Sequence, residues 1–257
     1  MRKLLRNIYL NILGSIKKPM PGIHIINAHF ASPNEVSDFD RKTFEQFLKI
    51  ITKNAKIISL EKATQMIIDK QTSSGKVFVA LTFDDGFEEC HSVIAPLLEK
   101  YECKGAFFIN ANFIDSTTEY QNEFNKRVKI FTKKPMSWEQ VKDLHNRGHL
   151  IGSHNLDHLN MADLNEDELE FQLKENKKIL ENRLDYNCNY FAWTYGQMQH
   201  FSEKALQITN QYHDFVYSGT NYKKYFSMNN KVINRRQIEP FWSKKHINYF
   251  LSINKVY

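Results

Sequence analysis

The sequence is poor in cysteine and has no run of apolar residues long enough to cross a membrane. Its 257 residues include three cysteines, Cys90, Cys103 and Cys188, an odd number at wide spacing. This pattern argues against a disulfide framework and against a Cys-X-X-Cys metal site, and it favours a reducing compartment. No stretch approaches the roughly 18 apolar residues that a membrane-spanning helix requires.

The N-terminal residues also lack the features of an export signal. Their apolar segment, residues 4–16, is interrupted by Arg6, Asn7 and Asn11, and no small-residue cleavage site follows it. We therefore expect a cytoplasmic protein.

A strong excess of one charge is absent as well. The formal net charge is +6, with 35 Lys and Arg against 29 Asp and Glu, mixed along most of the chain. This pattern does not indicate nucleic-acid binding, and it fits at most a weak preference for acidic glycans, phosphate-linked sugars or lipid headgroups. With 42% hydrophobic and 25% charged residues, the chain has the composition of one packed globular domain.

The first 18 residues predict a basic amphipathic helix. The apolar residues fall at helical spacing on one face: Leu4, Leu5, Ile8, Tyr9, Ile12, Leu13 and Ile16. Five cations and no acid accompany them: Arg2, Lys3, Arg6, Lys17 and Lys18. Such a helix can lie in the interface of an anionic membrane with its apolar face down. The same stripe is also compatible with packing on the domain or with contact to another subunit.

From residue 19 onward, predicted strands and helices alternate, and we assign residues 19–257 to one domain. The predicted strands cover residues 23–28, 56–59, 77–83, 105–109, 150–152 and 189–193. Capping boxes that begin at Ser137 and Asn165 open two of the helices between them. The alternation predicts parallel strands with crossover helices, hence an α/β barrel or a doubly wound sheet. Residues 110–135 are polar with weak periodicity, so we expect a long loop that shapes a substrate site.

Two carboxylates follow the apolar strand at 77–83. Asp84 and Asp85 precede Gly86, so they lie at the carboxyl end of a buried parallel strand, where barrel active sites are found. Neighbouring carboxylates in a confined place repel each other, so one of them requires a cation or a proton. Taken alone, the Asp-Asp-Gly segment is also typical of a simple turn.

Two histidines follow the strand at 150–152 in the segment Ser-His-Asn-Leu-Asp-His. His154 and His158 are four residues apart, and a helical turn between them would aim both rings at one point. Two imidazoles and one carboxylate make a site suited to Zn²⁺, and also to Co, Ni, Mn or Fe. Taken alone, a single His pair would favour a capping or surface role. The position of both motifs at strand ends of one alternating fold favours the metal site.

These two motifs together resemble the polysaccharide deacetylase family, carbohydrate esterases that contain a NodB-type homology domain. The resemblance rests on Leu-Thr-Phe-Asp-Asp-Gly at 81–86 and on Ser-His to His at 153–158, and it covers roughly residues 23–240. It implies a single-domain α/β fold, a distorted (β/α) barrel of about seven parallel strands. It also implies a divalent metal cofactor, with Zn the expected ion.

The resemblance assigns roles to residues of this sequence. Asp84 would be the general base, and Asp85, His154 and His158 would hold the metal. The segment Phe-Ala-Trp-Thr-Tyr-Gly at 191–196 is similar to the third family motif, which implies that the backbone N–H of Tyr195 stabilises the oxyanion. Trp193 would support the same segment.

The sequence departs from the family at two points. The third motif lacks the Arg that orients the base, and Arg235 or Arg236 is the candidate to supply that charge. The late Leu-X-His motif, whose His protonates the leaving amine, has no match after Arg236, and His246 lies outside the pattern. His29, beside an early strand, is the candidate for that acid, although a core or loop role is also compatible.

The resemblance implies hydrolysis of the N-acetyl group of an amino sugar, with an acylated amino-sugar glycan of the cell envelope or its precursor as the substrate. Removal of a formyl group or of an O-acetyl group is a second reading, because the same metal chemistry serves each small acyl group. A catalytically weak, metal-retaining glycan-binding protein is a third. We expect no nucleic-acid partner, and we expect peripheral contact with the inner face of the membrane if residues 1–18 bind it.

Overall fold

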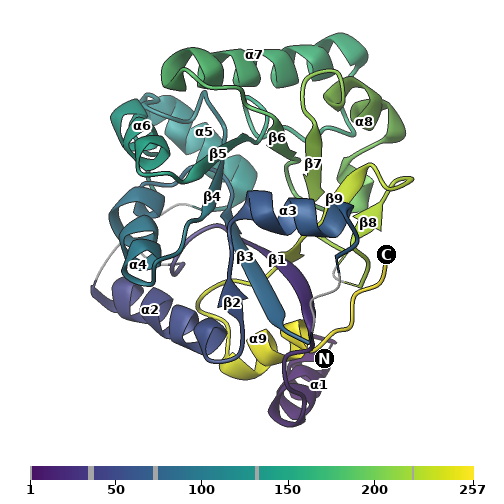
Figure 1. Cartoon of the computed structure of the whole chain (residues 1–257). Helices are drawn as coiled ribbons and strands as arrows, with labels where there is room; N and C mark the ends of the chain where they lie inside the picture. The colour runs from purple at the N-terminus through teal and green to yellow at the C-terminus, as the bar shows by residue number, and fades with distance from the viewer. Residues whose placement is uncertain (1, 34–37, 72–74, 131–132, 222) are drawn as a thin grey trace.

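The structure, a computed structural model, describes residues 2–33, 38–71, 75–130, 133–221 and 223–257, with the side chains of residues 2–4, 38 and 39 left aside. Its described strands form one curled sheet in the order β10-β1-β3-β4-β5-β6-β7-β9-β8, with β2 beside β3. All neighbouring strands pair in parallel except β8 and β9. The distorted α/β barrel expected from the sequence is therefore confirmed, as a sheet that curls without closing (Figure 1).

The strands are short. They are β1 (Gly22–Ala28), β2 (Lys56–Ile57), β3 (Val77–Phe83), β4 (Ala106–Ile109), β5 (Leu150–Ser153), β6 (Tyr190–Ala192), β7 (Phe215–Ser218), β8 (Phe226–Ser227), β9 (Val232–Asn234) and β10 (Arg236–Gln237). β1 and β3 are apolar and almost fully buried, as expected for parallel strands that are covered on both faces.

Helices cover the sheet between these strands. They are α1 (Arg2–Ile16), α2 (Asp38–Thr52), α3 (Leu60–Ile68), the π-helical turn η1 (Cys90–Ile94) that continues into α4 (Ala95–Lys100), α5 (Thr118–Val128), α6 (Trp138–Asn146), α7 (Glu166–Leu184), the 3₁₀ turn η2 (Met198–His200), α8 (Glu203–Thr209) and α9 (Lys244–Leu251). Both predicted capping boxes are present, at Ser137 with Gln140 and at Asn165 with Glu168.

The prediction of a loop over the whole of residues 110–135 is wrong, because α5 occupies its middle. Thr117 caps this helix by accepting a hydrogen bond from the Tyr120 N–H. Phe124 is fully buried and stacks on Phe113 with ring centroids 3.8 Å apart. The helix is polar on its other sides, so tertiary packing through one aromatic face decides its conformation.

Helix α1 packs on α9 at one edge of the molecule (Figure 1). Leu10 is its buried contact, while most of the apolar stripe noted in the sequence is exposed, with Ile12 at 56% and Ile16 at 74%. The interpretation that this stripe packs on the domain is therefore wrong for these side chains. None of the described helices is long and apolar enough to span a membrane.

Candidate metal centre and active-site cleft

Asp84 and Asp85 leave the end of β3 in different directions. The Asp84 N–H donates to the Ala28 carbonyl at 3.0 Å, which holds this end of β3 beside β1. Asp85 and Gly86 then take left-handed backbone conformations, with φ of 77° and 88°. A carboxylate-bearing residue tolerates this conformation better than a branched one. The turn sends the two neighbouring carboxylates to separate partners, which lowers their mutual repulsion.

His154 and His158 follow β5 and converge through a bend, whereas the sequence analysis considered a helical turn. Asn155 has a left-handed backbone with φ of 53°, and its Oδ1 accepts the His158 N–H at 2.6 Å. Asn110 donates to the carbonyls of His154 and Asn155, which fixes the same bend from β4. These amide hydrogen bonds, and not a helical turn, direct both rings at one point.

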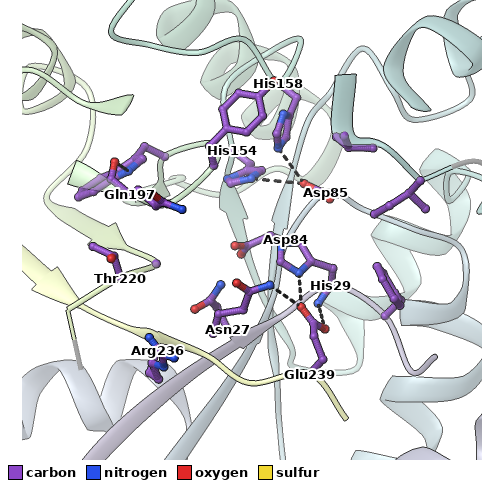
Figure 2. A pocket seen from close by; sticks show the side chains of 18 of the residues that line it. Asn27, His29, Asp84, Asp85, His154, His158, Gln197, Thr220, Arg236 and Glu239 are labelled. Atoms are coloured by element: carbon purple, nitrogen blue, oxygen red, sulfur yellow. Dashed lines mark hydrogen bonds and ion pairs between the residues drawn. The ribbon is translucent and has the colours of Figure 1, made fainter. Parts of the chain in front are cut away.

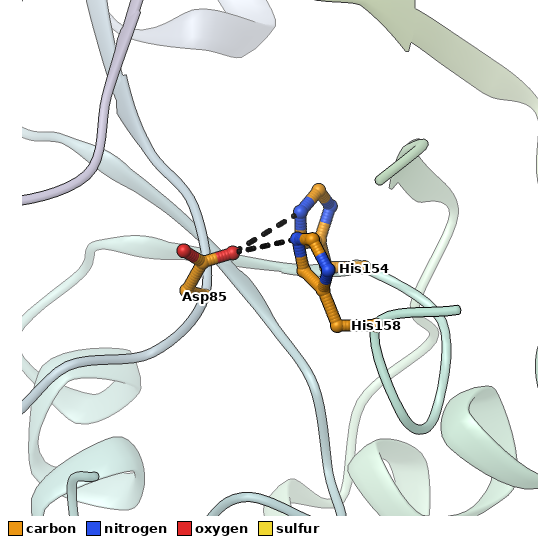
Figure 3. Close-up of side chains that lie close together, drawn as sticks. All are labelled: Asp85, His154 and His158. Atoms are coloured by element: carbon orange, nitrogen blue, oxygen red, sulfur yellow. Dashed lines mark ion pairs between the residues drawn. The ribbon is translucent and has the colours of Figure 1, made fainter. Parts of the chain in front are cut away.

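The two imidazoles face Asp85. The Nε2 atoms of His154 and His158 lie 3.4 Å and 3.2 Å from Asp85 Oδ1 (Figure 3). His154 Nδ1 lies 2.7 Å from the Ala192 carbonyl and therefore donates to it, so its Nε2 carries a free lone pair directed at Asp85. Within the described ranges, no other group of three His, Cys, Asp or Glu residues has ligand atoms this close together, within 4.8 Å.

The chemistry of this group fits a cation. All three residues are buried, and Asp85 Oδ1 has no hydrogen-bond donor among the described residues. Burial acts to raise the pKa of Asp85, but the two imidazoles lower it well below its ordinary value. Burial lowers the pKa of His158 and outweighs the attraction of Asp85. A buried carboxylate that faces two imidazole nitrogens is the donor set that a divalent metal requires.

Asp84 is paired with a fully buried arginine. The Arg235 Nη1 and Nη2 atoms donate to Asp84 Oδ1 and Oδ2 at 2.7 Å and 2.8 Å, a bidentate pair. Arg235 is itself fixed by donation to the Ser218 carbonyl and to Thr82 Oγ1, each at 2.9 Å. Burial acts to raise the pKa of Asp84, but Arg235 lowers it, so Asp84 is ionised. Of the two candidate arginines, Arg235 contacts Asp84, whereas Arg236 faces the cleft and covers the Phe250 ring.

His29, at the end of β1, forms a pair with Glu239. Its Nδ1 lies 2.7 Å from Glu239 Oε1, and its backbone N–H donates to Oε2 at 3.2 Å. Gln237 donates to the same carboxylate at 2.9 Å. Burial alone would lower the pKa of His29, but Glu239 and, more weakly, Asp85 and Asp84 raise it to about 10. His29 is therefore a cation at neutral pH, with its Nε2 proton free to be donated.

Sequence reasoning did not identify Glu239, although it noted the surrounding residues. Glu239 becomes a site residue because β10 pairs with β1, which brings together residues 210 positions apart. A Glu-Pro pair that follows a short strand was the available signal. This pair indicates a site residue only once the order of the strands is known.

The third motif forms the opposite wall of the site. Trp193 is fully buried and stacks on Phe201 at 4.3 Å, and its Nε1 donates to the Gln197 carbonyl, so it supports the loop after β6. Tyr195 has a left-handed φ of 60° and a ring 4.7 Å from that of His158. No hydrogen bond between described residues uses the Tyr195 N–H.

These groups open into one cleft of about 520 Å³ (Figure 2). Its apolar lining includes Phe30 and Phe241, which stack on each other at 5.8 Å. Val128 and Ile130 also line it, so the end of α5 and the residues after it do shape the site, as the sequence analysis expected of this segment. Polar groups line the remainder: Asn27, Gln197, Thr220 and Arg236. An apolar face with a few polar groups is typical of a small-molecule or glycan site.

Comparison with known proteins identifies the family. Residues 71–213, more than half of the chain, match the sequence profile described as polysaccharide deacetylase. The chain belongs to the polysaccharide deacetylase family. The Bacillus subtilis protein YxkH is 23% identical over 195 residues, which cover 76% of this chain and 64% of that protein. The peptidoglycan-N-acetylglucosamine deacetylase of Bacillus cereus is 30% identical over 124 residues, which cover 48% of this chain and 38% of the relative.

The chain thus spans less than two thirds of the length of these curated relatives. Among solved structures, the Streptococcus pyogenes deacetylase PplD in complex with acetate shares the fold, with a TM-score of 0.66 and 18% identity. That likeness covers 90% of this chain and 97% of PplD.

In this member of the polysaccharide deacetylase family, two charged side chains of the site bear on the points at which its sequence departs from the family motifs. A guanidinium from the end of β9 lies where the third motif lacks one, against the Asp84 carboxylate. A histidine cation from the end of β1 lines the cleft, which lacks the late histidine. The cleft therefore contains both an ionised carboxylate and a histidine cation.

Proposed function

We propose that this chain hydrolyses the acyl amide of an N-acetylated amino sugar in a cell-envelope polysaccharide or its precursor. The observation that carries the proposal is the buried group of Asp85, His154 and His158 beside an ionised Asp84 in one cleft. The named activities of the relatives, on peptidoglycan N-acetylglucosamine and on chitin, support an acylated amino-sugar glycan as the substrate class.

Asp85, His154 and His158 would hold one divalent cation, and Zn²⁺ is the ion that two imidazoles and a carboxylate suit best. When bound, the cation supplies Lewis-acid activation of water and of the acyl carbonyl. The Ala192 carbonyl keeps His154 in the tautomer that presents Nε2.

Asp84 would accept the proton of the attacking water. Arg235 holds both carboxylate oxygens and keeps the pKa of Asp84 low, so the base is ionised before the substrate binds. The water oxygen adds to the acyl carbon, and the backbone N–H of Tyr195 would stabilise the negative charge that develops on the acyl oxygen. Asp84 lies beside the metal ligands without belonging to them, as a general base must.

His29 would donate the proton that the leaving amine requires. The carbon–nitrogen bond breaks as His29 Nε2 transfers its proton to the amine nitrogen, which yields the free amino sugar and the carboxylate. Glu239 accepts from Nδ1 and so orients the ring with Nε2 available to the cleft. Because the pKa of His29 is raised to about 10 and that of Asp84 is lowered, the donor is protonated and the base is ionised at neutral pH.

The wall of Phe30, Phe241 and Trp242 would support the sugar ring, and the polar groups opposite would bind its hydroxyls. The cytoplasmic location expected from the sequence stays a prediction.

The decisive experiment combines metal analysis with an assay of acyl release. Wild type is expected to bind one equivalent of Zn²⁺ and to release acetate from N-acetylglucosamine oligomers or lipid-linked precursors. Asp85→Ala and His154→Ala should lose both the metal and the release. Asp84→Asn should keep the metal and lose at least about a hundredfold in rate, the range of a general base.

The substrate panel separates the alternatives. Release of formate or of O-linked acetate in preference to N-linked acetate would assign a different acyl group to the same site. Stoichiometric metal without release from any substrate would favour a glycan-binding protein, and absence of metal in the folded wild type would contradict the proposal.

A further inference from the structure

Helix α1 has two apolar faces, and only one of them is covered. On the covered face, Leu10 is 5% exposed and Gly14 lies against the backbone of Lys245 in α9. A Cβ at Gly14 would lie 1.8 Å from the Lys245 carbonyl oxygen, so the glycine permits the close approach of the two helices. This contact fixes the rotation of α1 about its own axis.

The opposite face carries five exposed side chains, which we call the α1 stripe. Their exposed fractions are 60% for Leu5, 47% for Ile8, 55% for Tyr9, 56% for Ile12 and 74% for Ile16. Their positions follow the helical period, so they form one continuous strip on the side away from Leu10. At its edge the Tyr9 ring also contacts the Tyr249 ring of α9, with centroids 5.9 Å apart. An isolated exposed apolar residue such as Phe171 needs no explanation, but a strip of five indicates a surface that something covers.

The charge around this helix pair is of one sign. Residues 1–34 and 240–257, which contain α1 and α9, have eight Lys and Arg and no Asp or Glu. The rest of the chain therefore has 27 Lys and Arg against 29 Asp and Glu, a slight negative excess. The net positive charge of the protein is thus contributed entirely by the two segments that contain the packed pair of α1 and α9. Arg6, Lys17 and Lys18 on or next to α1 are exposed, as are Lys244 and Lys245 at the start of α9.

We propose that the α1 stripe inserts into the interface of an anionic lipid bilayer, with the flanking cations at the headgroups. Leucine, isoleucine and tyrosine on one face and cations beside it are the features of a helix that lies in the membrane plane. Lys and Arg near an anionic surface add attraction that neutral lipid does not provide. A second copy of the chain is a poorer occupant, because apposed stripes would bring two acid-free, cationic surfaces together.

This surface is connected to the cleft by a short piece of chain. Phe241 and Trp242 line the cleft, and Ser243 caps α9 directly after them. α9 is the helix on which α1 packs. Contact with a bilayer would therefore hold the catalytic cleft at the membrane, whatever reaction the cleft performs.

The test uses the full chain and vesicles of two compositions. One set contains 30% phosphatidylglycerol in phosphatidylcholine and the other contains phosphatidylcholine alone. We expect wild type to co-sediment with the anionic vesicles at least tenfold more strongly than with the neutral ones. High salt should reduce the binding, because it screens the cations.

Variants separate the apolar contribution from the electrostatic one. Ile8→Ser/Ile12→Ser removes two stripe side chains without touching the covered face and should weaken vesicle binding more than tenfold. Arg6→Gln/Lys18→Gln should weaken binding to anionic vesicles by about fivefold for each cation. Phe171→Ser and Lys174→Gln, at comparably exposed positions of the acid-rich helix α7, are the matched controls and should bind as wild type does.

Three results would overturn the proposal. The first is failure of the folded wild type to bind anionic vesicles. The second is equal loss of binding in the α7 controls. The third is a wild-type dimer by light scattering that becomes monomeric in Ile8→Ser/Ile12→Ser while neither form binds vesicles, because a second copy would then cover the stripe.

Discussion

Asp84 and Asp85 are adjacent in the sequence, yet each has its own partners. Asp84 is held by the Arg235 guanidinium, and Asp85 faces the two imidazoles. The left-handed backbone at Asp85 separates them. Two buried carboxylates can therefore both be ionised, as the proposed roles of ligand and base require, because neither relies on the other for its protonation state.

Loss of the Arg235 guanidinium should change the pKa of Asp84 without changing metal binding. In Arg235→Gln, burial of Asp84 is no longer opposed by a bidentate cation, so the pKa of Asp84 should rise. A base works when ionised and is lost as pH falls through its pKa, so the acidic limb of the kcat profile should move to higher pH. Stability should fall by about 3 to 5 kcal/mol, as when one partner of a buried pair is removed.

The pH profile and the bound metal of Arg235→Gln are the two measurements. Unchanged Zn²⁺ content with a shifted acidic limb is the expected result. An acidic limb at the same pH as in wild type would show that Arg235 does not set the pKa of Asp84.

The alkaline limb should depend on Glu239. A general acid works when protonated and is lost as pH rises through its pKa, so wild type should lose activity near the His29 pKa of about 10. In Glu239→Gln the largest cause of that elevation is removed and burial remains, so the alkaline limb should move to lower pH. Titration of kcat, with His29→Ala as the reference for a missing acid, measures the shift. If the limb stays in place, His29 is not the proton donor.

At the scale of elements, α7 is attached to the strand ends that carry the site through one buried amide. Asn176 accepts the Ala111 N–H at 2.7 Å, and it donates to the Ile109 carbonyl at 3.0 Å and to Ser153 Oγ at 2.8 Å. Ser153 directly precedes His154, a candidate metal ligand. The amide thus joins α7 to the carboxyl ends of β4 and β5, next to His154.

Asn176→Ala should therefore weaken both the fold and the metal site. It leaves the Ala111 N–H and the Ser153 hydroxyl without the Asn176 amide as a partner, and one such buried group costs about 1 to 3 kcal/mol. We expect a loss of about 3 kcal/mol in urea denaturation and a lower affinity for Zn²⁺. Asn182→Ala, at an exposed position of the same helix, is the control and should change neither. Equal effects of the two substitutions would contradict the role of the Asn176 amide.

The sequence analysis succeeded where local pattern and chemistry agree. The structure contains the apolar strand that leads into Asp84 and Asp85, and it contains the capping boxes of α6 and α7. Each of these features depends only on residues that are neighbours in the sequence. It failed at α5, where the face of Tyr120, Phe124 and Val128 has helical spacing but polar residues dominate the rest. That helix depends on the contact of Phe124 with Phe113, which no local pattern reports.

The order of the strands must be known before Arg235 can be chosen over Arg236 and before the partner of His29 can be found. Both arginines are adjacent in sequence, and the alternation of side chains at a strand end decides which one reaches Asp84. The exposure of the α1 stripe likewise depended on which side of the helix α9 covers.

At the scale of the whole molecule, the site is assembled from distant parts of the chain. β10 follows β9 in sequence but pairs with β1, on the far side of the sheet order. This connection joins His29 to Glu239 beside the cleft, while the candidate metal ligands come from the ends of β3 and β5. A cation shared between those two ends would add a tertiary contact that the unfolded chain cannot make, so metal binding is coupled to the stability of the fold.

Metal removal should therefore lower the melting temperature of wild type. A ligand at 100 times its Kd stabilises a folded protein by about 2.7 kcal/mol, which corresponds to about 5 to 10 °C for a chain of this size. We expect the Zn²⁺-loaded protein to melt higher than the chelated protein by that amount. Asp85→Ala should melt at one temperature with or without Zn²⁺, because it lacks the carboxylate that joins the two strand ends, whereas Asp84→Asn should retain the metal-dependent shift. The same shift in Asp85→Ala as in wild type would mean that the stabilising ion binds elsewhere on the protein.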